Sequence, residues 1–433
     1  MKTADYTDRL CISAYGAVTP LGSTIKELSD KLREGKSGVR EIQKFDHRAL
    51  KSSKVAIPQE GNKSIRWPRK HRFRNGDIFY AHLAASRLKE NLDISSIYLP
   101  HEVGCILGVD EPTFDIDKLI ELSKHNATIT DRKSQIQESV HVLRTGDFLD
   151  TETAAVIKSV HDVIPFTGMT FGHLGLCCAS TQSIGLAMRA IARGEIKAAI
   201  CGGVSAKVTP LSLVRLEGMG VITTDEQFTF EARSRPFDRK RSGFMLGEGA
   251  VMFCIEKESA IRTRGGTPLA YLNGYGGALC AQNIVAPHTE EVEMMLSMQR
   301  ALEDAGLNPE DIDMINAHGT STLQNDLHEA RAIARLFGKP TPPVTATKAN
   351  HGHLMAAAGS MEILGIITCF QDNYIPAIIN LDEPDPQFSK DVSLVKVTRQ
   401  EKLKYVIKNS FGMGGGAATL IIGNPAMCKQ GDF

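Results

Sequence analysis

The chain has 433 residues, of which 42% are hydrophobic and 23% are charged, and its 50 basic residues balance its 50 acidic ones. This length predicts two domains or one large duplicated unit. The charge balance argues against binding of nucleic acid or of a membrane surface by the chain as a whole. No apolar run reaches the roughly 18 residues that a membrane-spanning helix needs.

Cysteine usage and the first residues indicate the compartment. The nine cysteines are odd in number, form no CxxC pair and lie mostly in apolar runs. We therefore expect reduced thiols, with neither a disulfide framework nor a zinc site. The opening MKTADYTDRL lacks the apolar stretch of a signal peptide. These features predict a cytoplasmic protein.

Strand-like and helix-like segments alternate through the first half. Apolar runs predict strands at 10–14, 103–109, 198–201 and 250–256, and helical periodicity predicts helices at 25–33, 78–88 and 180–193. We expect a turn at Gly16–Gly22, and we expect Gly202-Gly203 to close the strand that precedes it. The charged segment 110–170 predicts helices joined by loops.

The second half repeats the alternation. Strands are predicted at 269–274, 313–317, 344–347, 404–410 and 418–423, and helices at 290–305, 326–337 and 356–369. Such alternation predicts an α/β protein with a largely parallel sheet covered on both faces. A strand ends in a small-residue turn that opens an apolar helix at 177–193 and again at 348–369, which indicates a duplicated α/β unit.

Cys177-Cys178 lies between a predicted strand end and a predicted helix start. Unpaired N–H groups and the helix dipole at that place stabilise a thiolate, so we expect the thiol pKa to be lowered. The alternative is a buried cysteine that only fills space, since cysteine is among the most buried residue types.

Three later segments also carry chemical groups. His318 follows a predicted buried strand, at the kind of strand end where α/β active sites gather. Lys348 follows the next strand and precedes His351 and His353, which have no carboxylate or cysteine beside them, so we expect no metal. The glycines of 409–416 let backbone approach a ligand and offer N–H donors to an oxyanion.

Taken in order, these segments resemble one family. The matching residues are Cys177, His318-Gly-Thr-Ser-Thr322, Lys348, Gly352-His353, Ala-Ala-Gly359 and Asn409-Ser-Phe-Gly412, with further matches at Gly16–Gly22, Arg235–Asp238, Gly243–Gly249 and Ile379–Pro384. They are similar to those of the elongating β-ketoacyl-acyl carrier protein synthases of the thiolase superfamily. The resemblance extends from about residue 10 to about residue 423.

The resemblance implies a thiolase-like α/β fold with duplicated halves in a five-layer α-β-α-β-α arrangement. The first half, 1–258, would carry the nucleophile and an inserted, divergent segment, 110–172. The second half, 259–433, would carry the histidines. The implied reaction is decarboxylative Claisen condensation of malonyl-acyl carrier protein with an enzyme-bound acyl group, in fatty-acid or specialised acyl-chain synthesis, without a cofactor.

The resemblance also assigns roles to residues. The family's cysteine precedes an Ile-Gly pair by seven positions, and Ile184-Gly185 therefore selects Cys177 over Cys178 as the acylated nucleophile. The remaining implied roles are decarboxylation for His318 and His353, an active-site lysine for Lys348, support for Glu362 and Asp326, pantetheine binding for Thr320 and Thr322, and the oxyanion hole and gate for Cys177, Met413 and Phe411.

Position 413 departs from the family, which usually has a gating phenylalanine there. Because methionine is more flexible and segment 110–172 diverges most, the acyl chain length is not predicted. Arg69, Lys70, Arg72 and Arg74 are expected to dock an acidic acyl carrier protein, unless they form only a solvated approach to a helix.

We expect a homodimer. The alternatives are a thiolase or an initiating synthase, which carry Cys-His-Cys or Cys-His-Asn sets, and a chain-length-factor-like partner of a heterodimer, which usually lacks the cysteine.

Overall fold

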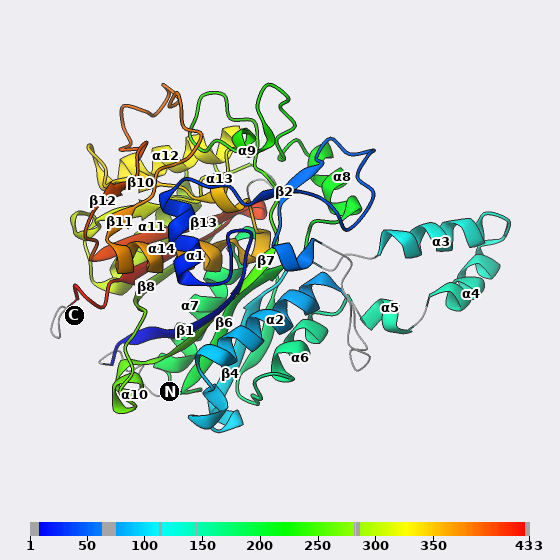
Figure 1. The fold of residues 1–433 in the computed structure, drawn as a ribbon, viewed down its shortest axis with the longest axis horizontal. Coiled ribbons are helices and arrows are strands. Elements are labelled where there is room, and N and C mark those ends of the chain that lie inside the picture. The colour runs from blue at the N-terminus through cyan, green and yellow to red at the C-terminus, as the bar shows by residue number, and fades with distance from the viewer. Residues whose placement is uncertain are drawn as a thin grey trace.

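The computed structural model describes residues 8–62, 75–111, 115–143, 145–149, 151–280, 282 and 286–428 (Figure 1). Its main sheet has ten strands. They are β1 (Leu10–Val18), β4 (Val103–Gly108), β5 (Thr170–His173), β6 (Ala198–Ser205), β7 (Gly249–Lys257), β8 (Ala270–Leu279), β9 (Met314–Asn316), β10 (Val344–Thr345), β13 (Tyr405–Gly412) and β14 (Gly416–Gly423).

The strand order is the same in both halves of the chain. The sheet runs β10-β9-β13-β14-β8-β1-β7-β6-β4-β5. Read outward from the central β8–β1 pair, each half has its first strand innermost, followed by its fifth, fourth, second and third strands. Within each half only the fifth strand, β7 or β14, is antiparallel to its neighbours. The repeated unit that the sequence predicts is thus observed. The expectation of a largely parallel sheet is wrong: four of the nine strand pairings are parallel and five are antiparallel, because β7 and β14 oppose both of their neighbours and the two halves meet at the antiparallel β8–β1 pair. The division at 258/259 falls between β7 and β8 and stays a prediction.

Helices form three layers around the strands. Helices α7 (Ala179–Ala192) and α14 (Ala358–Asp372) contact strands of both halves, so they form the middle layer. The outer helices are α2 (Gly76–Asn91) and α6 (Thr153–His161) on the first half, and α11 (Val292–Ala305) and α12 (Leu323–Phe337) on the second. Separate apolar clusters fill the three spaces between helices and strands. This is the predicted five-layer arrangement.

Two glycines explain where the predicted boundaries are wrong. β1 continues through Gly16, where a turn was expected, because α2 packs so closely that a Cβ at Gly16 would lie 2.0 Å from the Ala84 carbonyl oxygen. β6 likewise continues through Gly202 and Gly203, where the strand was expected to close. A Cβ on Gly203 would lie 2.5 Å from the Ala356 carbonyl oxygen. Glycine here permits close packing and does not end the strand.

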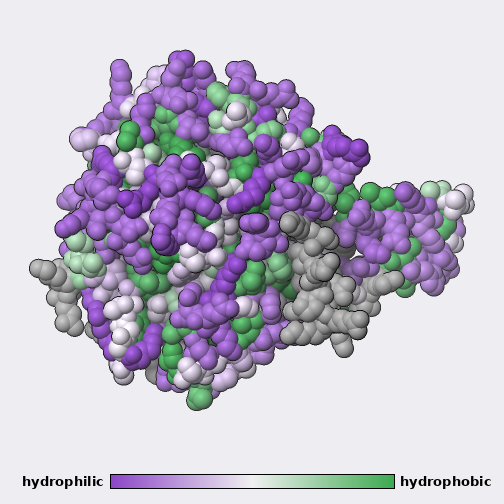
Figure 2. All heavy atoms as spheres, viewed as in Figure 1, coloured by the Kyte–Doolittle hydropathy of each residue, from purple (hydrophilic) through white to green (hydrophobic). Residues whose placement is uncertain are grey.

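Helices α3 (Ile116–Asn126) and α4 (Arg132–Val142) form a hairpin that projects from the body (Figure 1). Neither helix has a buried residue, and Ile136 and Val140 are 62% and 73% exposed. Apolar patches are visible on this arm (Figure 2). The short helix α5 (Thr145–Leu149) and then α6 lead back to the sheet. The helices and loops predicted for segment 110–170 are confirmed for its described residues up to the start of β5. No helix among the described residues is long and apolar enough to cross a membrane.

Smaller elements lie apart from these layers, among them α9 (Phe230–Arg233), α10 (Glu258–Thr263) and the pair β11 (Tyr374–Ile375) and β12 (Arg399–Gln400). Helix α1 (Ile25–Arg33), which the sequence predicts, packs on α14. The short helices α8 (Pro210–Gly218) and α13 (Lys348–His351) carry residues of the site region, and β2 (Val39–Glu41) pairs with β3 (Lys54–Ala56) outside the main sheet.

Candidate active site

Cys177 lies at the start of the central helix α7. A short 3-10 turn, Leu176–Cys178, joins the segment after β5 to this helix, and Leu176 has a left-handed φ of 48°. That conformation is strained for a branched side chain, and such strain is found mainly at functional sites. The turn leaves the Cys177 side chain 4% exposed at the N-terminal end of a 14-residue helix.

His353 contacts the sulfur of Cys177. The Nε2 atom of His353 lies 3.0 Å from Cys177 Sγ, and the backbone N–H of Met355 donates to His353 Nδ1 over 3.2 Å. A ring nitrogen can accept a hydrogen bond only if it carries no proton, so Nδ1 is unprotonated. The neutral ring therefore carries its proton on Nε2. His353 therefore presents an N–H donor to the site.

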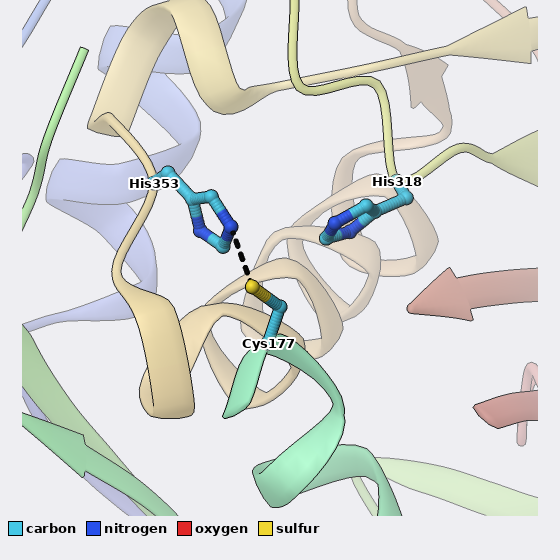
Figure 3. A group of neighbouring side chains, drawn as sticks. All are labelled: Cys177, His318 and His353. Atoms are coloured by element: carbon cyan, nitrogen blue, oxygen red, sulfur yellow. Dashed lines mark hydrogen bonds between the residues drawn. The ribbon is translucent and has the colours of Figure 1, made fainter. Parts of the chain in front are cut away.

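His318 approaches from the other side (Figure 3). Its ring centroid lies 5.4 Å from that of His353, and one ring nitrogen of each histidine lies within 4.8 Å of the other and of Cys177 Sγ. Lys348 Nζ lies 3.1 Å from His318 Nδ1. An ammonium can only donate, so His318 also carries its proton on Nε2. The structure thus brings together four residues from three separate segments of the sequence.

The histidines and the thiol are all uncharged. Burial lowers the pKa of both histidines well below the usual value, and the charge of Lys348 lowers both further. Burial also raises the pKa of Cys177 to about 12, although Lys348 and backbone N–H groups, including that of Met413, act to lower it. The expectation of a lowered thiol pKa is therefore wrong, because the cost of burying the charge exceeds the effect of the helix terminus.

Glu362 holds two buried lysines beside the site. One of its carboxylate oxygens contacts Lys348, and the other lies 2.8 Å from Lys408 Nζ. Burial acts to raise the pKa of Glu362, but the two lysine charges outweigh it and lower the pKa. The sequence does not single out Lys408. Its one signal is a lysine within the apolar β13 run, which must find a partner if the strand is buried.

Glu329, which the sequence reading also misses, fixes the backbone before the His318 loop. Its carboxylate accepts from the N–H of His318 at 2.7 Å and from that of Gly319 at 2.8 Å. Asp326 has the same function nearby, because it accepts from the N–H of Ser321 and of Phe237. The supporting role expected for Asp326 therefore consists of hydrogen bonds to backbone N–H groups, and none of these belongs to His318.

The two threonines of the His318 loop lie together. The hydroxyl oxygens of Thr320 and Thr322 are 2.9 Å apart, and Thr322 also caps α12 by accepting from the N–H of Asn325. Thr320 is buried and Thr322 half-buried. Their hydroxyls lie on the second half of the chain, on the same loop as His318.

The loop that contains Met413 borders Cys177. The Phe411 ring lies 6.0 Å from the His318 ring, at the end of β13, and Met413 is half-buried. Gly415 has φ of 77°, and a Cβ there would lie 1.7 Å from the Cys280 carbonyl oxygen. Only glycine fits this position, so the loop path depends on it.

Cys178 points away from the reacting group. Its Sγ lies 3.1 Å from the Ser410 carbonyl oxygen and 3.2 Å from that of Gly416, and its side chain is fully buried. It joins α7 to β13 and β14, which is a packing role. The structure therefore separates the two adjacent thiols.

Cys177, His318 and His353 also have the spacing of metal ligands. A metal would need a deprotonated thiol and a free lone pair on the ring nitrogen that faces it. Here Nε2 of each ring carries the proton, so the arrangement supplies donors to an oxyanion and would need rearrangement to hold a metal. The proposed docking residues Arg69, Lys70, Arg72 and Arg74 lie outside the described residues.

Comparison with known proteins points to one family. Residues 82–260 match the family model "Beta-ketoacyl synthase, N-terminal domain", and residues 269–382 match "Beta-ketoacyl synthase, C-terminal domain". A Coxiella burnetii protein named 3-oxoacyl-[acyl-carrier-protein] synthase 2 is 31% identical over 96% of this chain and 98% of its own.

Solved structures agree on the fold. A beta-ketoacyl synthase from Burkholderia phymatum STM815 has a TM-score of 0.84 and 25% identity over 96% of this chain and 99% of its own. The ishigamide ketosynthase/chain length factor has a TM-score of 0.83 over the same shares, at 24% identity. This last likeness shows the fold alone.

Proposed function

The chain belongs to the β-ketoacyl synthase family, and from this we propose that it condenses an acyl group held on Cys177 with a malonyl group carried by an acyl carrier protein. The product is a 3-oxoacyl thioester. The observation that carries the proposal is the pair of imidazoles that present protonated Nε2 atoms toward the Cys177 sulfur.

In the first step the sulfur of Cys177 attacks the carbonyl carbon of the acyl thioester. The thiol is uncharged, so its proton has to leave as the new C–S bond forms, and the departing carrier thiol takes up a proton. The N–H groups of Cys177 and Met413 are the donors for the tetrahedral oxyanion. Covalent capture divides one difficult condensation into two easier steps.

In the second step malonyl thioester loses CO₂ and the electrons of the broken C–C bond form an enolate. The Nε2–H groups of His318 and His353 donate to the thioester oxygen where this charge develops. Both rings are neutral and neither nitrogen that faces the site has a free lone pair, so they act as hydrogen-bond donors without removing a proton. The enolate carbon then attacks the acyl carbon, and the C–S bond to Cys177 breaks.

The acyl carrier protein is proposed as the partner because the relatives carry it in their name. On the same ground Thr320 and Thr322 are proposed to bind the pantetheine arm that enters past the His318 loop. A second copy of the chain is proposed to cover the projecting α3–α4 hairpin, whose isoleucine and valine side chains are exposed. Sedimentation of the purified protein tests this last point, and a monomer at micromolar concentration would contradict it.

Intact-mass measurement tests the function. Wild type incubated with a carrier protein that bears an acyl group should gain the mass of that group. Addition of a carrier protein that bears a malonyl group should then remove this mass and give a 3-oxoacyl product. Cys177→Ala should gain no mass, whereas Cys178→Ala should behave as wild type. An adduct that persists in Cys177→Ala would refute the assignment of the nucleophile.

A further inference from the structure

Asp110 is a buried carboxyl that the condensation does not use. It follows the end of β4 by two residues and is 6% exposed. Its Oδ2 atom is buried without a hydrogen-bond partner of normal geometry among the described residues, as is the hydroxyl of Ser205, which acts to lower the pKa of Asp110. An unpaired buried acceptor is costly, typically by about 1 to 3 kcal/mol. Such an oxygen takes its hydrogen bond from an ordered water or from a polar group of a ligand.

The carboxyl lies close to the nucleophile. The end of β4 packs closely on the first turn of α7: a Cβ on Gly108 would lie only 2.5 Å from the backbone nitrogen of Ser180. The charge of Asp110 raises the pKa of Cys177, and the N–H of Ala356 faces the Asp110 carboxyl.

The space beside Asp110 is polar. Asp110 and Asp77 line a cavity of about 70 Å³. Oδ1 of Asp77 is likewise buried without a partner among the described residues. Asn75, Thr153 and Thr209 also line this cavity. A cavity of this size and lining holds water or the polar end of a small group.

The neighbouring cation does not balance the two carboxyls. Burial raises the pKa to about 7 for Asp110 and about 6 for Asp77, although the charge of Lys207 acts to lower both. Lys207 Nζ donates to the Glu111 carbonyl oxygen at 2.5 Å, and the Glu111 carboxylate pairs with Arg215. Two acceptors therefore share one lysine that also bonds elsewhere.

Cys177 lies among apolar side chains, and one of them, Val208, is next in the chain to Thr209, which lines the cavity. Cys177 belongs to a cluster with Val208, Leu216, Phe244 and Met355. An acyl chain attached to Cys177 would pack on these side chains first and then meet the carboxyl oxygens. A saturated chain that reached them would cover them with hydrocarbon and leave them without water, which is unfavourable.

We propose that the acyl group carried by Cys177 bears a hydrogen-bond donor, an O–H or N–H, which Asp110 Oδ2 accepts. Asp77 is the second acceptor of the same cavity. This inference rests on the proposed condensing function, and it narrows the acyl substrate to a hydroxylated or aminated chain in place of a plain fatty acyl chain.

The test compares four acyl groups on the same acyl carrier protein: hexanoyl, 3-hydroxyhexanoyl, 6-hydroxyhexanoyl and 6-aminohexanoyl. Acylation of Cys177 is followed by intact mass in wild type, Asp110→Ala and Asp110→Asn. Asp162→Asn, which removes an exposed carboxylate ion-paired with Lys158, is the control for net charge.

In wild type and in Asp162→Asn, at least one donor-bearing chain should react about tenfold or more faster than hexanoyl, in line with a hydrogen bond to a charged group. The faster of the hydroxyl and amino arms identifies the donor. Asp110→Ala should lose the preference while hexanoyl reacts at least as fast as in wild type. If Asp110→Ala does not fold, Asp110→Asn should lower the preference at least threefold.

Hexanoyl reacting as fast as every donor-bearing chain in wild type would overturn this inference and leave the condensing function intact. A preference unchanged in the folded Asp110 variants would do the same. Failure of all four chains to acylate Cys177 would instead refute the proposed function, and with it this inference.

Discussion

Lys348 offers the sharpest separation of the two half-reactions. Its ammonium is fully buried, contacts Glu362 and lies 3.1 Å from His318 Nδ1. In Lys348→Met the volume is kept but His318 loses the donor that holds its proton on Nε2. The ring is then free to present an unprotonated Nε2 to the enolate oxygen, so one oxyanion donor is lost. Such losses slow reactions by about 10² to 10³, or about 2.7 to 4 kcal/mol of transition-state stabilisation.

The assay measures the two steps separately. Release of labelled CO₂ from malonyl-carrier protein reports decarboxylation, and intact mass reports acylation of Cys177. We expect decarboxylation to fall by about 10² to 10³ in Lys348→Met, and acylation to fall much less, because Lys348 affects the thiol only through its charge.

Lys408→Met is the matched control. Lys408 pairs with the same carboxylate, yet its contacts are Glu362, Ser410 and Thr181, with none to His318. Each variant leaves Glu362 with one lysine, so both should lose a similar free energy of unfolding, about 1.5 to 3 kcal/mol. Only Lys348→Met should lose decarboxylation selectively. Equal loss of decarboxylation in the two variants, or equal loss of both steps in Lys348→Met, would refute the reasoning.

Three further outcomes follow from the structure. Cys178→Ala should lower the melting temperature and leave iodoacetamide labelling of Cys177 unchanged; label on Cys178 in wild type would contradict its packing role. Burial lowers the pKa of His351 to about 4 in the folded chain, from 6.5 in the unfolded chain. As the pH falls between these values, the unfolded chain binds a proton that the folded chain does not. Stability should therefore drop by about 1.4 kcal/mol per pH unit between those values, and His351→Gln should flatten the dependence of urea midpoints on pH; an unchanged slope would contradict this. Gly415→Ala should abolish acylation, because its Cβ would meet the Cys280 carbonyl oxygen at 1.7 Å; wild-type acylation rates would show that the loop can shift.

The sequence predicts the elements of this fold well and the charge state of its site poorly. Helical and strand periodicity locates most elements because burial follows the same periods. It cannot tell that Gly16 and Gly203 are sites of close packing, since this depends on α2 and on the segment at Ala356, far away in the chain. Motif order places Cys177 and Lys348, but the raised thiol pKa depends on how completely the folded chain excludes water.

Lys408 and Asp110 escape prediction for a related reason. A lysine in a strand or an aspartate after one is ordinary in a sequence. Each becomes informative only when it is buried, because a charge without water needs a partner. For Lys408 the partner is Glu362, and for Asp110 Oδ2 no described residue provides it.

The duplicated fold explains why the nucleophile and a histidine meet at all. Leu176 and Met355 each have a left-handed φ, 48° and 46°, and each begins a 3-10 turn that leads into a central helix, α7 or α14. In the first copy the residue after the strained one is the nucleophile, Cys177. In the second copy the strained residue gives its own N–H to His353 Nδ1, and the next, Ala356, turns its N–H toward Asp110. Because α7 and α14 lie in the same middle layer, the two turns face each other. One copy of the repeated unit therefore supplies the thiol, and the other supplies the N–H group that fixes the tautomer of the histidine beside it.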